Sequence, residues 1–342
     1  MKRVYCIAEA GLNHNGDVEI AKKMIDVAIE CKADAVKFQK RDVDQMATKD
    51  VLDKPFTNFP SFGSTYREVR EHLELTKSEY KELRDYCRGK IDFLVTPFDI
   101  QSLEFLDDLN IDGIKIAAHS LTDIPLLEEI GKRDAPIYLS TGMSTLEDIK
   151  LAVKTLDSDE KRTKEEDKNK LYILHCVSQY PMDVQFANLP MINKLKEIFP
   201  NYEIGWSDHQ NGISLASAAT ALGVSVIEKH FTLDRVMEGF DHAMSLEPLG
   251  LKKCIRDVRI VERAMKYYPK KPMPNEMECF NDYRRTIVSK VQIPKGTIIT
   301  RDMLTTKAPN IGLSPKLIPE VVGKKAKIDI KEEEHITFYM IE

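Results

Sequence analysis

The chain has 342 residues, of which 42% are apolar and 31% are charged, a globular balance that excludes a disordered protein. The formal net charge of −5 gives no electrostatic reason to expect nucleic-acid or membrane-surface binding. The six cysteines form no CxxC pair, no apolar run approaches a membrane span, and no secretory signal is visible. We therefore expect a cytoplasmic protein with no membrane and no nucleic-acid partner.

Short apolar runs alternate with longer amphipathic segments over the first 267 residues. A helix is predicted from about residue 17, and further helices over 78–88, 99–109, 121–132, 145–156, 188–199, 212–222 and 247–267. Strands are predicted at 4–8, 35–38, 93–95, 113–116, 137–139, 171–174, 202–204 and 224–227. Eight alternating units in roughly 250 residues predict a parallel (β/α)₈ barrel, the TIM-barrel fold. A doubly wound open sheet is the alternative, but no GxGxxG follows the first strand.

The character of the sequence changes after residue 268. Three prolines, at positions 269, 272 and 274, predict a linker over residues 269–281. Residues 282–342 are rich in short strand-like runs, at 286–291 and 321–326, with a turn at 293–297. The prediction is a barrel domain over residues 1–268 followed by a small β-rich domain over residues 282–342.

Polar residues gather where the predicted strands end, which is the face where barrels of this type carry their chemistry. A single Lys or His at a strand end is more often structural, but polar residues at all eight strand ends favour a site. These residues are Glu9, Lys37, Gln39, Thr96, Lys115, Ser140, His175, Ser207, Asp208, His209, Glu228 and His230.

The residue types suggest two adjacent sites. Cations and hydroxyl donors at Lys37, Thr96, Lys115 and Ser140 suit the phosphate and carboxylate of one small ligand. The remaining strand-end groups include three imidazoles, those of His175, His209 and His230.

His209 and His230 end adjacent predicted strands and can ligate one divalent ion, which leaves positions for a substrate oxygen and a water. Asp241 follows as a candidate outer ligand or acid/base group. A metal beside an anion site fits Lewis-acid activation of a carbonyl.

Several blocks, taken in order, resemble the sialic acid synthase family. They are AEAGLNHNGD at 8–17, KFQ at 37–39, STGM at 140–143, YP at 180–181, SDH at 207–209, EKHFTLD at 228–234 and SLEP at 245–248. The tail, through IPKGT at 293–297 and VGKKA at 322–326, is similar to the family's small antifreeze-like domain, of the SAF or β-clip type.

The resemblance implies condensation of phosphoenolpyruvate (PEP) with an N-acyl mannosamine-type sugar or its 6-phosphate, giving a nine-carbon 2-keto acid and phosphate. It also implies a Mn²⁺ or Mg²⁺ ion and a domain-swapped homodimer in which the small domain of one chain caps the barrel of the other. Position by position, it implies metal ligands at His209 and His230, PEP contacts at Lys37, Gln39, Thr96, Lys115, Ser140 and Ser207, sugar contacts at Asn13 and Tyr180, and catalytic groups at Glu9 and Asp241.

Two departures from the family pattern bear on the site. The family's Lys-Ile-x-Ser-Gly-Glu/Asp block reads KIAAHS at 115–120, so an acidic residue and a hydroxyl are missing, and His119 or Asp123 is the candidate replacement. In the tail, Ala308 stands where bacterial members carry an Arg that helps to hold the sugar's N-acyl group.

Residues 62–74 resemble a block of the animal-type enzymes, which use the sugar 6-phosphate. Arg67 and Arg70 in this block are candidate sugar-phosphate contacts, although a solvated helix start explains them equally well. Two other functions stay open: a homologue that binds PEP or a sugar acid without turnover, and a metal-dependent aldolase or lyase that uses no PEP.

Overall fold

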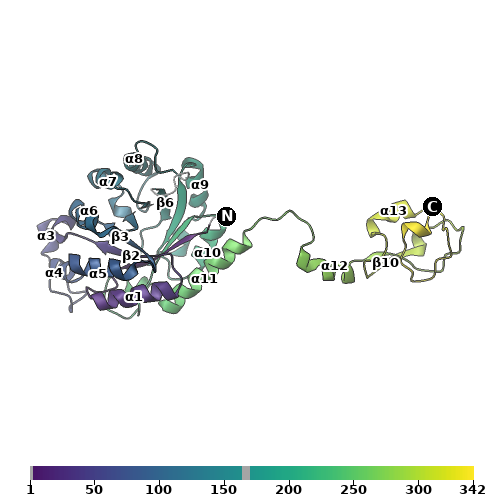
Figure 1. The fold of residues 1–342 in the computed structure, drawn as a ribbon, viewed down its shortest axis with the longest axis horizontal. Helices are drawn as coiled ribbons and strands as arrows, with labels where there is room; N and C mark the ends of the chain where they lie inside the picture. The colour runs from purple at the N-terminus through teal and green to yellow at the C-terminus, as the bar shows by residue number, and fades with distance from the viewer. Residues whose placement is uncertain (1–2, 164–169) are drawn as a thin grey trace. The chain divides into compact units, whose positions relative to one another are not determined.

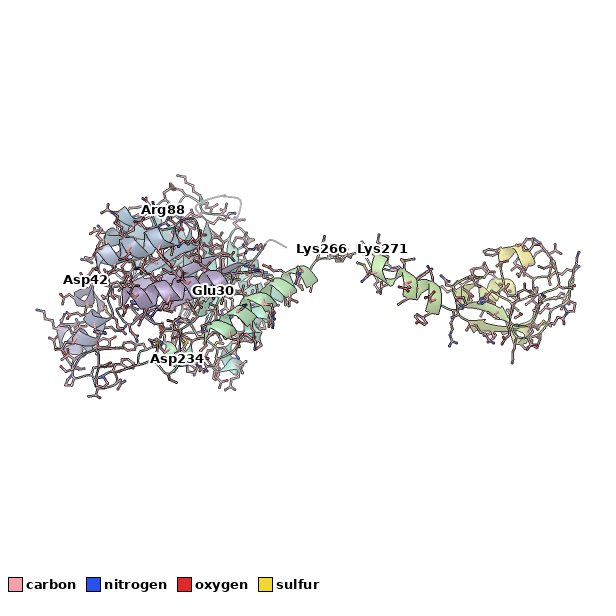
Figure 2. All side chains as sticks on the ribbon, turned by 60° about the horizontal axis from the view of Figure 1, so that its bottom comes forward. Glu30, Asp42, Arg88, Asp234, Lys266 and Lys271 are labelled. Carbon is pink, nitrogen blue, oxygen red and sulfur yellow. The ribbon has the colours of Figure 1, made fainter. Side chains whose placement is uncertain are left out.

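The computed structural model describes residues 3–163 and 170–342. The chain divides into two compact units, Met1–Lys266 and Tyr267–Glu342 (Figure 1). Each unit has its own apolar core. Figure 2 labels Lys266 and Lys271, which lie on either side of this boundary in the sequence.

The first unit is a closed barrel of eight parallel strands, which confirms the predicted (β/α)₈ fold. Each strand pairs with the next one in the chain, and the last pairs with the first, where Glu9 lies opposite His230. The strands are β1 (Tyr5–Gly11), β2 (Ala35–Lys40), β3 (Asp92–Pro97), β4 (Gly113–Ile116), β5 (Ile137–Ser140), β6 (Leu171–Cys176), β7 (Glu203–Asp208) and β8 (Val226–His230).

Helices surround the barrel (Figure 1), and short polar side chains cap the first turns of several of them. Asp17 accepts hydrogen bonds from two backbone N–H groups of the first helix, and Thr76 forms a capping box with Glu79. The helices are α1 (Val18–Glu30), α5 (Lys77–Cys87), α6 (Ile100–Leu106), α7 (Ile124–Gly131), α8 (Leu146–Leu156), α9 (Pro190–Ile198), α10 (Ser214–Ala221) and α11 (Pro248–Ala264). The 3₁₀ turns are η1 (Asp107–Leu109), η2 (Ala118–Ser120), η3 (Val184–Phe186) and η4 (His242–Met244).

The long polar segment between β2 and α5 contains three short helices that were not predicted: α2 (Val43–Met46), α3 (Lys49–Leu52) and α4 (Tyr66–His72). Helix α4 begins with a capping box between Thr65 and Glu68. An apolar cluster anchors this segment: buried Leu12, Val69 and Leu73 pack with four partly buried phenylalanines, which include Phe240 from the segment after β8. The cluster holds α4 close to the chain that follows β8.

The barrel strands bury alternate residues on opposite sides, as the two-residue period of a strand requires. Outward-facing side chains form the large core beneath the helices. Inward-facing side chains form a second apolar cluster at the amino-terminal end of the barrel: Tyr5, Ile7, Ala35, Leu94, Tyr138, Tyr172, Leu174 and Val226. The barrel is therefore plugged below its carboxyl end.

The second unit contains one antiparallel pair, β9 (Thr286–Ser289) and β10 (Leu304–Lys307), together with isolated bridges and short turns. The strand predicted at 321–326 is wrong, because Pro319 sits in the first turn of helix α13 (Ile318–Val321) and Gly323 adopts a positive φ. The predicted linker also contains the start of α12 (Met277–Tyr283). The unit's 3₁₀ turns are η5 (Pro274–Glu276), η6 (Arg301–Met303), η7 (Pro315–Leu317) and η8 (Phe338–Met340).

None of the helices in the described parts of the chain is both long and apolar enough to cross a lipid bilayer.

Candidate active site

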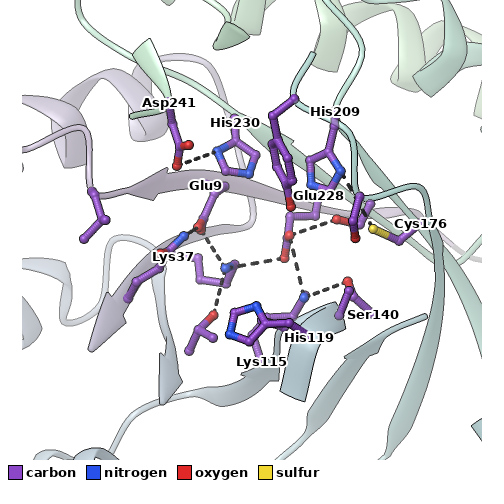
Figure 3. Close-up of a pocket in the computed structure, with 18 of the residues that line it drawn as sticks. Glu9, Lys37, Lys115, His119, Ser140, Cys176, His209, Glu228, His230 and Asp241 are labelled. Carbon is purple, nitrogen blue, oxygen red and sulfur yellow. Dashed lines mark hydrogen bonds and ion pairs between the residues drawn. The ribbon is translucent and has the colours of Figure 1, made fainter. Parts of the chain in front are cut away.

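A cavity of about 280 Å³ opens among the residues at the carboxyl ends of the barrel strands (Figure 3). Its wall contains all of the predicted site residues except Asn13, Arg67 and Asp123, the alternative to His119. The predicted residues that line it are Glu9, Lys37, Gln39, Arg70, Thr96, Lys115, His119, Ser140, Tyr180, Ser207, His209, His230 and Asp241.

Two buried lysines form the centre of the cavity. Lys37 Nζ lies 2.8 Å from Glu9 Oε2 and donates a hydrogen bond of 2.9 Å to Thr96 Oγ1. Lys115 Nζ donates a hydrogen bond of 2.7 Å to Ser140 Oγ. The predicted cations and hydroxyls therefore converge.

Glu228 lies between the two lysines, as Figure 3 shows. Its carboxylate oxygens are 3.8 Å from Lys37 Nζ and 3.9 Å from Lys115 Nζ, and Oε1 accepts a hydrogen bond of 3.1 Å from Ser207 Oγ. Burial alone would raise the pKa of Glu228, but the positive charges of Lys115 and Lys37 lower it. Burial lowers the pKa of Lys115, while Glu228 opposes that shift. The Glu228 carboxylate thus lies between the two buried lysines and offsets their charge.

The two imidazoles lie side by side on the wall, with ring centroids 5.4 Å apart. His209 Nδ1 contacts the carbonyl oxygen of Val177 at 2.8 Å, which fixes the ring and leaves Nε2 for another partner. His230 Nδ1 is buried without a hydrogen-bond partner and lies 3.7 Å from Asp241 Oδ2. Burial and the neighbouring His230 lower the pKa of His209 to about 3, so this ring is neutral at pH 7.

Imidazoles with a free ring nitrogen are common ligands of divalent transition metals. Within the described residues no group of three or more His, Cys, Asp and Glu side chains is arranged around one point. His209 and His230 are therefore two candidate metal ligands and not a complete ligand set on their own.

Asn13 acts behind the cavity wall. Its amide donates to the carbonyl oxygen of Phe231 at 2.8 Å and to Ser245 Oγ at 2.9 Å, and Ser245 Oγ donates to the carbonyl oxygen of Asp241 at 2.6 Å. Asn13 therefore positions the segment that carries Asp241, whereas the sequence pattern indicated a direct sugar contact.

The two candidate replacements for the missing strand-four acid lie in different places. His119 lines the cavity and stacks on Phe98 at 4.9 Å, and burial, with Arg41 and Lys115, lowers its pKa. Asp123 instead caps α7 by accepting a hydrogen bond from the backbone N–H of Leu126.

The two candidate arginines of α4 also differ. Arg70 lines the cavity, whereas Arg67 lies outside it and pairs with Asp44 at 2.5 Å and Asp53 at 2.8 Å.

Glu228, which the sequence places at a strand end without a specific role, and Arg41, which was not predicted, also line the wall. Strand alternation indicates the orientation of Glu228, because it lies two residues before His230 on one strand and therefore faces the same side. Lys229, between them, faces outward and lies 3.0 Å from Asp208.

The fold and the cavity together are those of a (β/α)₈-barrel enzyme with a polar cavity, lined by lysines and hydroxyl groups, at its strand ends. The chain belongs to the NeuB family, whose model matches residues 24–270, and a SAF domain model matches residues 284–342. The resemblance read from the sequence is thereby confirmed.

Relatives cover nearly the whole chain. The chain is 38% identical over 337 residues to N-acetylneuraminate-9-phosphate synthase of Homo sapiens, covering 97% of this chain and 91% of that protein. It is 37% identical over 338 residues to N,N'-diacetyllegionaminic acid synthase of Campylobacter jejuni, covering 98% and 99%. A crystal structure of N-acetylneuraminic acid synthetase from Leptospira borgpetersenii, in complex with citrate, matches with a TM-score of 0.68 at 33% identity, covering 81% of this chain and 90% of that chain.

Proposed function

We propose that this protein is a nonulosonate synthase that condenses PEP with an N-acyl mannosamine-type sugar. The C3 carbon of PEP forms a bond to the sugar's aldehyde carbon, water adds at C2 of PEP, and the bond from C2 to the phosphate oxygen breaks. The products are a nine-carbon 2-keto sugar acid and inorganic phosphate. The names of the family's relatives support a sugar-acid product of this class.

The observation that carries the proposal is the convergence of Lys37 and Lys115 with three hydroxyls, those of Thr96, Ser140 and Ser207. PEP carries a phosphate and a carboxylate a few bonds apart, and two ammonium groups with neighbouring hydroxyl donors match that pair of anions. Glu9 and Glu228 place carboxylate groups beside these two lysines in the buried site.

The proposal includes a divalent ion, Mn²⁺ or Mg²⁺, held by His209 and His230. When bound, such an ion polarises a carbonyl oxygen and makes a nearby water more acidic. The carbonyl oxygen of Val177 would hold His209 in the required tautomer, and Asp241 Oδ2 lies 3.7 Å from His230 Nδ1.

The remaining polar residues would orient the reactants and move protons. Lys37 and Lys115 fix the donor so that its reactive carbon faces the imidazole side of the cavity. Asp241, next to His230, is placed to exchange a proton with the sugar's carbonyl oxygen. His119, neutral because of its lowered pKa, replaces a missing strand-four acid as a hydrogen-bonding group at the cavity wall.

The proposal also includes a cytoplasmic location and a homodimer. Met143 and Tyr180 line the cavity, yet their side chains are 70% and 53% exposed, and exposed apolar groups beside a site are typical of a surface that a partner covers.

The test is phosphate release. Purified protein with PEP, Mn²⁺ and a panel of N-acyl hexosamines, with and without a 6-phosphate, should release phosphate from PEP only when the right sugar is present. Lys37→Ala should raise the apparent KM for PEP more than that for the sugar. Lys40→Ala is the matched control, because Lys40 pairs with Glu74 at 2.6 Å and does not line the cavity. No release across the panel would count against the proposal, and a product made from pyruvate without phosphate release would indicate an aldolase.

A further inference from the structure

Two arginines on the cavity wall have binding capacity that the proposed PEP and metal sites do not use. Arg41 follows β2 directly and is only 7% exposed, and its Nη1 is buried without a hydrogen-bond partner. Arg70, on α4, has a buried Nε that also lacks a partner. Within the described residues, neither guanidinium forms an ion pair with a carboxylate.

Aromatic rings hold both guanidinium groups in place. The Arg41 guanidinium carbon lies 3.7 Å from the centroid of Phe98, and that of Arg70 lies 4.1 Å from Phe240 and 4.9 Å from Tyr66. Stacking of this kind uses the face of the guanidinium and leaves its N–H edge for an acceptor. The two arginines are therefore oriented by rings and not by anionic partners.

Arg67, one turn earlier on the same helix, shows the contrast. Its guanidinium is paired with Asp44 and Asp53 outside the cavity. Burying a guanidinium group without an ionic partner lowers the stability of the folded protein. A guanidinium group that is paired with carboxylates near the solvent does not carry this penalty. Burial and the positive charge of Arg70 lower the pKa of Arg41 to about 10, so Arg41 stays charged at pH 7 and an anion beside it would offset the cost.

The arginine pair is separate from the lysine pair. Lys37, Gln39 and Arg41 follow one another at two-residue spacing, so the Arg41 backbone lies roughly 13 Å beyond that of Lys37 in the strand direction. Gln39 connects the two, because its Oε1 accepts a hydrogen bond of 2.5 Å from Arg41 and its Nε2 donates one of 2.6 Å to Glu9. A second anionic group, distinct from those of PEP, fits this outer position.

We propose that Arg41 and Arg70 bind a phosphate monoester at the end of the acceptor sugar farthest from its aldehyde, so that the protein acts on a sugar phosphate and makes a phosphorylated sugar acid. This inference rests on the proposed function. A phosphate monoester carries nearly two negative charges and three acceptor oxygens, which match two guanidinium groups better than the single charge of a carboxylate does.

The test compares N-acetylmannosamine with N-acetylmannosamine 6-phosphate as acceptors, measured as phosphate released from PEP against a blank without PEP. We expect kcat/KM to favour the phosphorylated acceptor by about 100-fold, the effect of two charge-assisted hydrogen bonds. Equal rates, or a preference for the unphosphorylated sugar, would overturn the inference while leaving the synthase function intact. No turnover of any acceptor would instead overturn the synthase function, and calorimetric binding of the two sugars would then still decide whether the arginines recognise phosphate.

Substitutions of the arginines test which side chains distinguish the phosphorylated from the unphosphorylated acceptor. Arg41→Gln and Arg70→Gln should each reduce the preference for the phosphorylated acceptor by about tenfold, mainly through its KM. Arg41→Lys keeps the charge but loses the planar fork, and should give an intermediate preference. Arg67→Gln, on the same helix, should keep the wild-type preference. A rise in the KM for PEP in place of that for the sugar phosphate would assign the arginines to the donor site and refute the inference.

Discussion

The barrel interior has a lower layer, at the amino-terminal ends of the eight strands, and an upper layer, at their carboxyl ends. The lower layer is apolar, whereas the upper layer is mostly polar or charged. On each strand, the lower position is an apolar residue or glycine, and the position two residues closer to the carboxyl end carries a charged group, a hydroxyl or a thiol. The pairs are Ile7 and Glu9, Ala35 and Lys37, Leu94 and Thr96, Gly113 and Lys115, Tyr138 and Ser140, Leu174 and Cys176, Gly205 and Ser207, and Val226 and Glu228.

This difference indicates that the lower layer contributes to stability and that the upper layer carries the groups for chemistry. The lower layer is packed so closely that a Cβ added at Gly113 would lie 2.9 Å from the ring of Tyr138. The upper layer instead buries charges, each partly offset by a neighbour of opposite sign. Burying charge lowers stability unless it is well compensated, so the upper layer is retained for a reason other than folding.

The largest effect should come from the imidazoles at the rim of the upper layer. His209→Ala or His230→Ala should remove bound Mn²⁺ and lower turnover by about 10³-fold, because metal activation of a carbonyl contributes several kcal/mol to catalysis. Metal content after dialysis and circular dichroism melting curves check both parts. His175→Gln is the control, since His175 faces out of the barrel and contacts the carbonyl oxygen of Ala187. Full metal content in both alanine variants would refute the assignment.

The barrel fold was predictable because the sequence patterns that indicate it involve residues close together in the chain. Hydrophobic periodicity and strand-to-helix alternation gave eight units, and the structure shifts their bounds by a few residues. The residues of β8 illustrate the limit: the strand was expected to end at Ile227, but it continues through Glu228 and Lys229 to His230. Charged residues inside a strand look like a loop in one sequence, because their burial depends on partners from other strands.

The location and general chemistry of the site were predictable from the sequence, but only some of its residues were. Strand ends meet at one face of a barrel, so Lys37 and Lys115 had to lie near each other. Arg41 was missed because it lies beyond the predicted end of the second strand, and its place depends on the ring of Phe98 from another loop. Arg67 and Arg70 looked equivalent in the sequence, and only the fold of α4 shows which one faces the cavity.

A substitution in the lower layer should reduce stability without altering the chemistry. Leu94→Ala removes a fully buried side chain and should lower the free energy of unfolding by about 3 kcal/mol, because the packed layer cannot collapse around the gap. Urea denaturation measures this loss. The KM for PEP, measured on the folded enzyme at low temperature, should stay at its wild-type value. A raised KM would show that the two layers are coupled and that their separation is wrong.

The smallest effect should come from the residue two positions further along the same strand. Thr96→Val preserves shape and removes the hydroxyl that accepts a hydrogen bond from Lys37. The loss of one hydrogen bond beside a charged group should raise the KM for PEP by about tenfold. The melting temperature should fall far less than in Leu94→Ala, because Lys37 keeps its contact with Glu9. Thr141→Val is the matched control: its hydroxyl donates to the carbonyl oxygen of Leu174 and is not part of the cavity wall, so the KM for PEP should not change. If Thr96→Val instead destabilises the barrel and leaves the KM unchanged, then this hydroxyl serves packing, and the boundary between the two layers lies above Thr96.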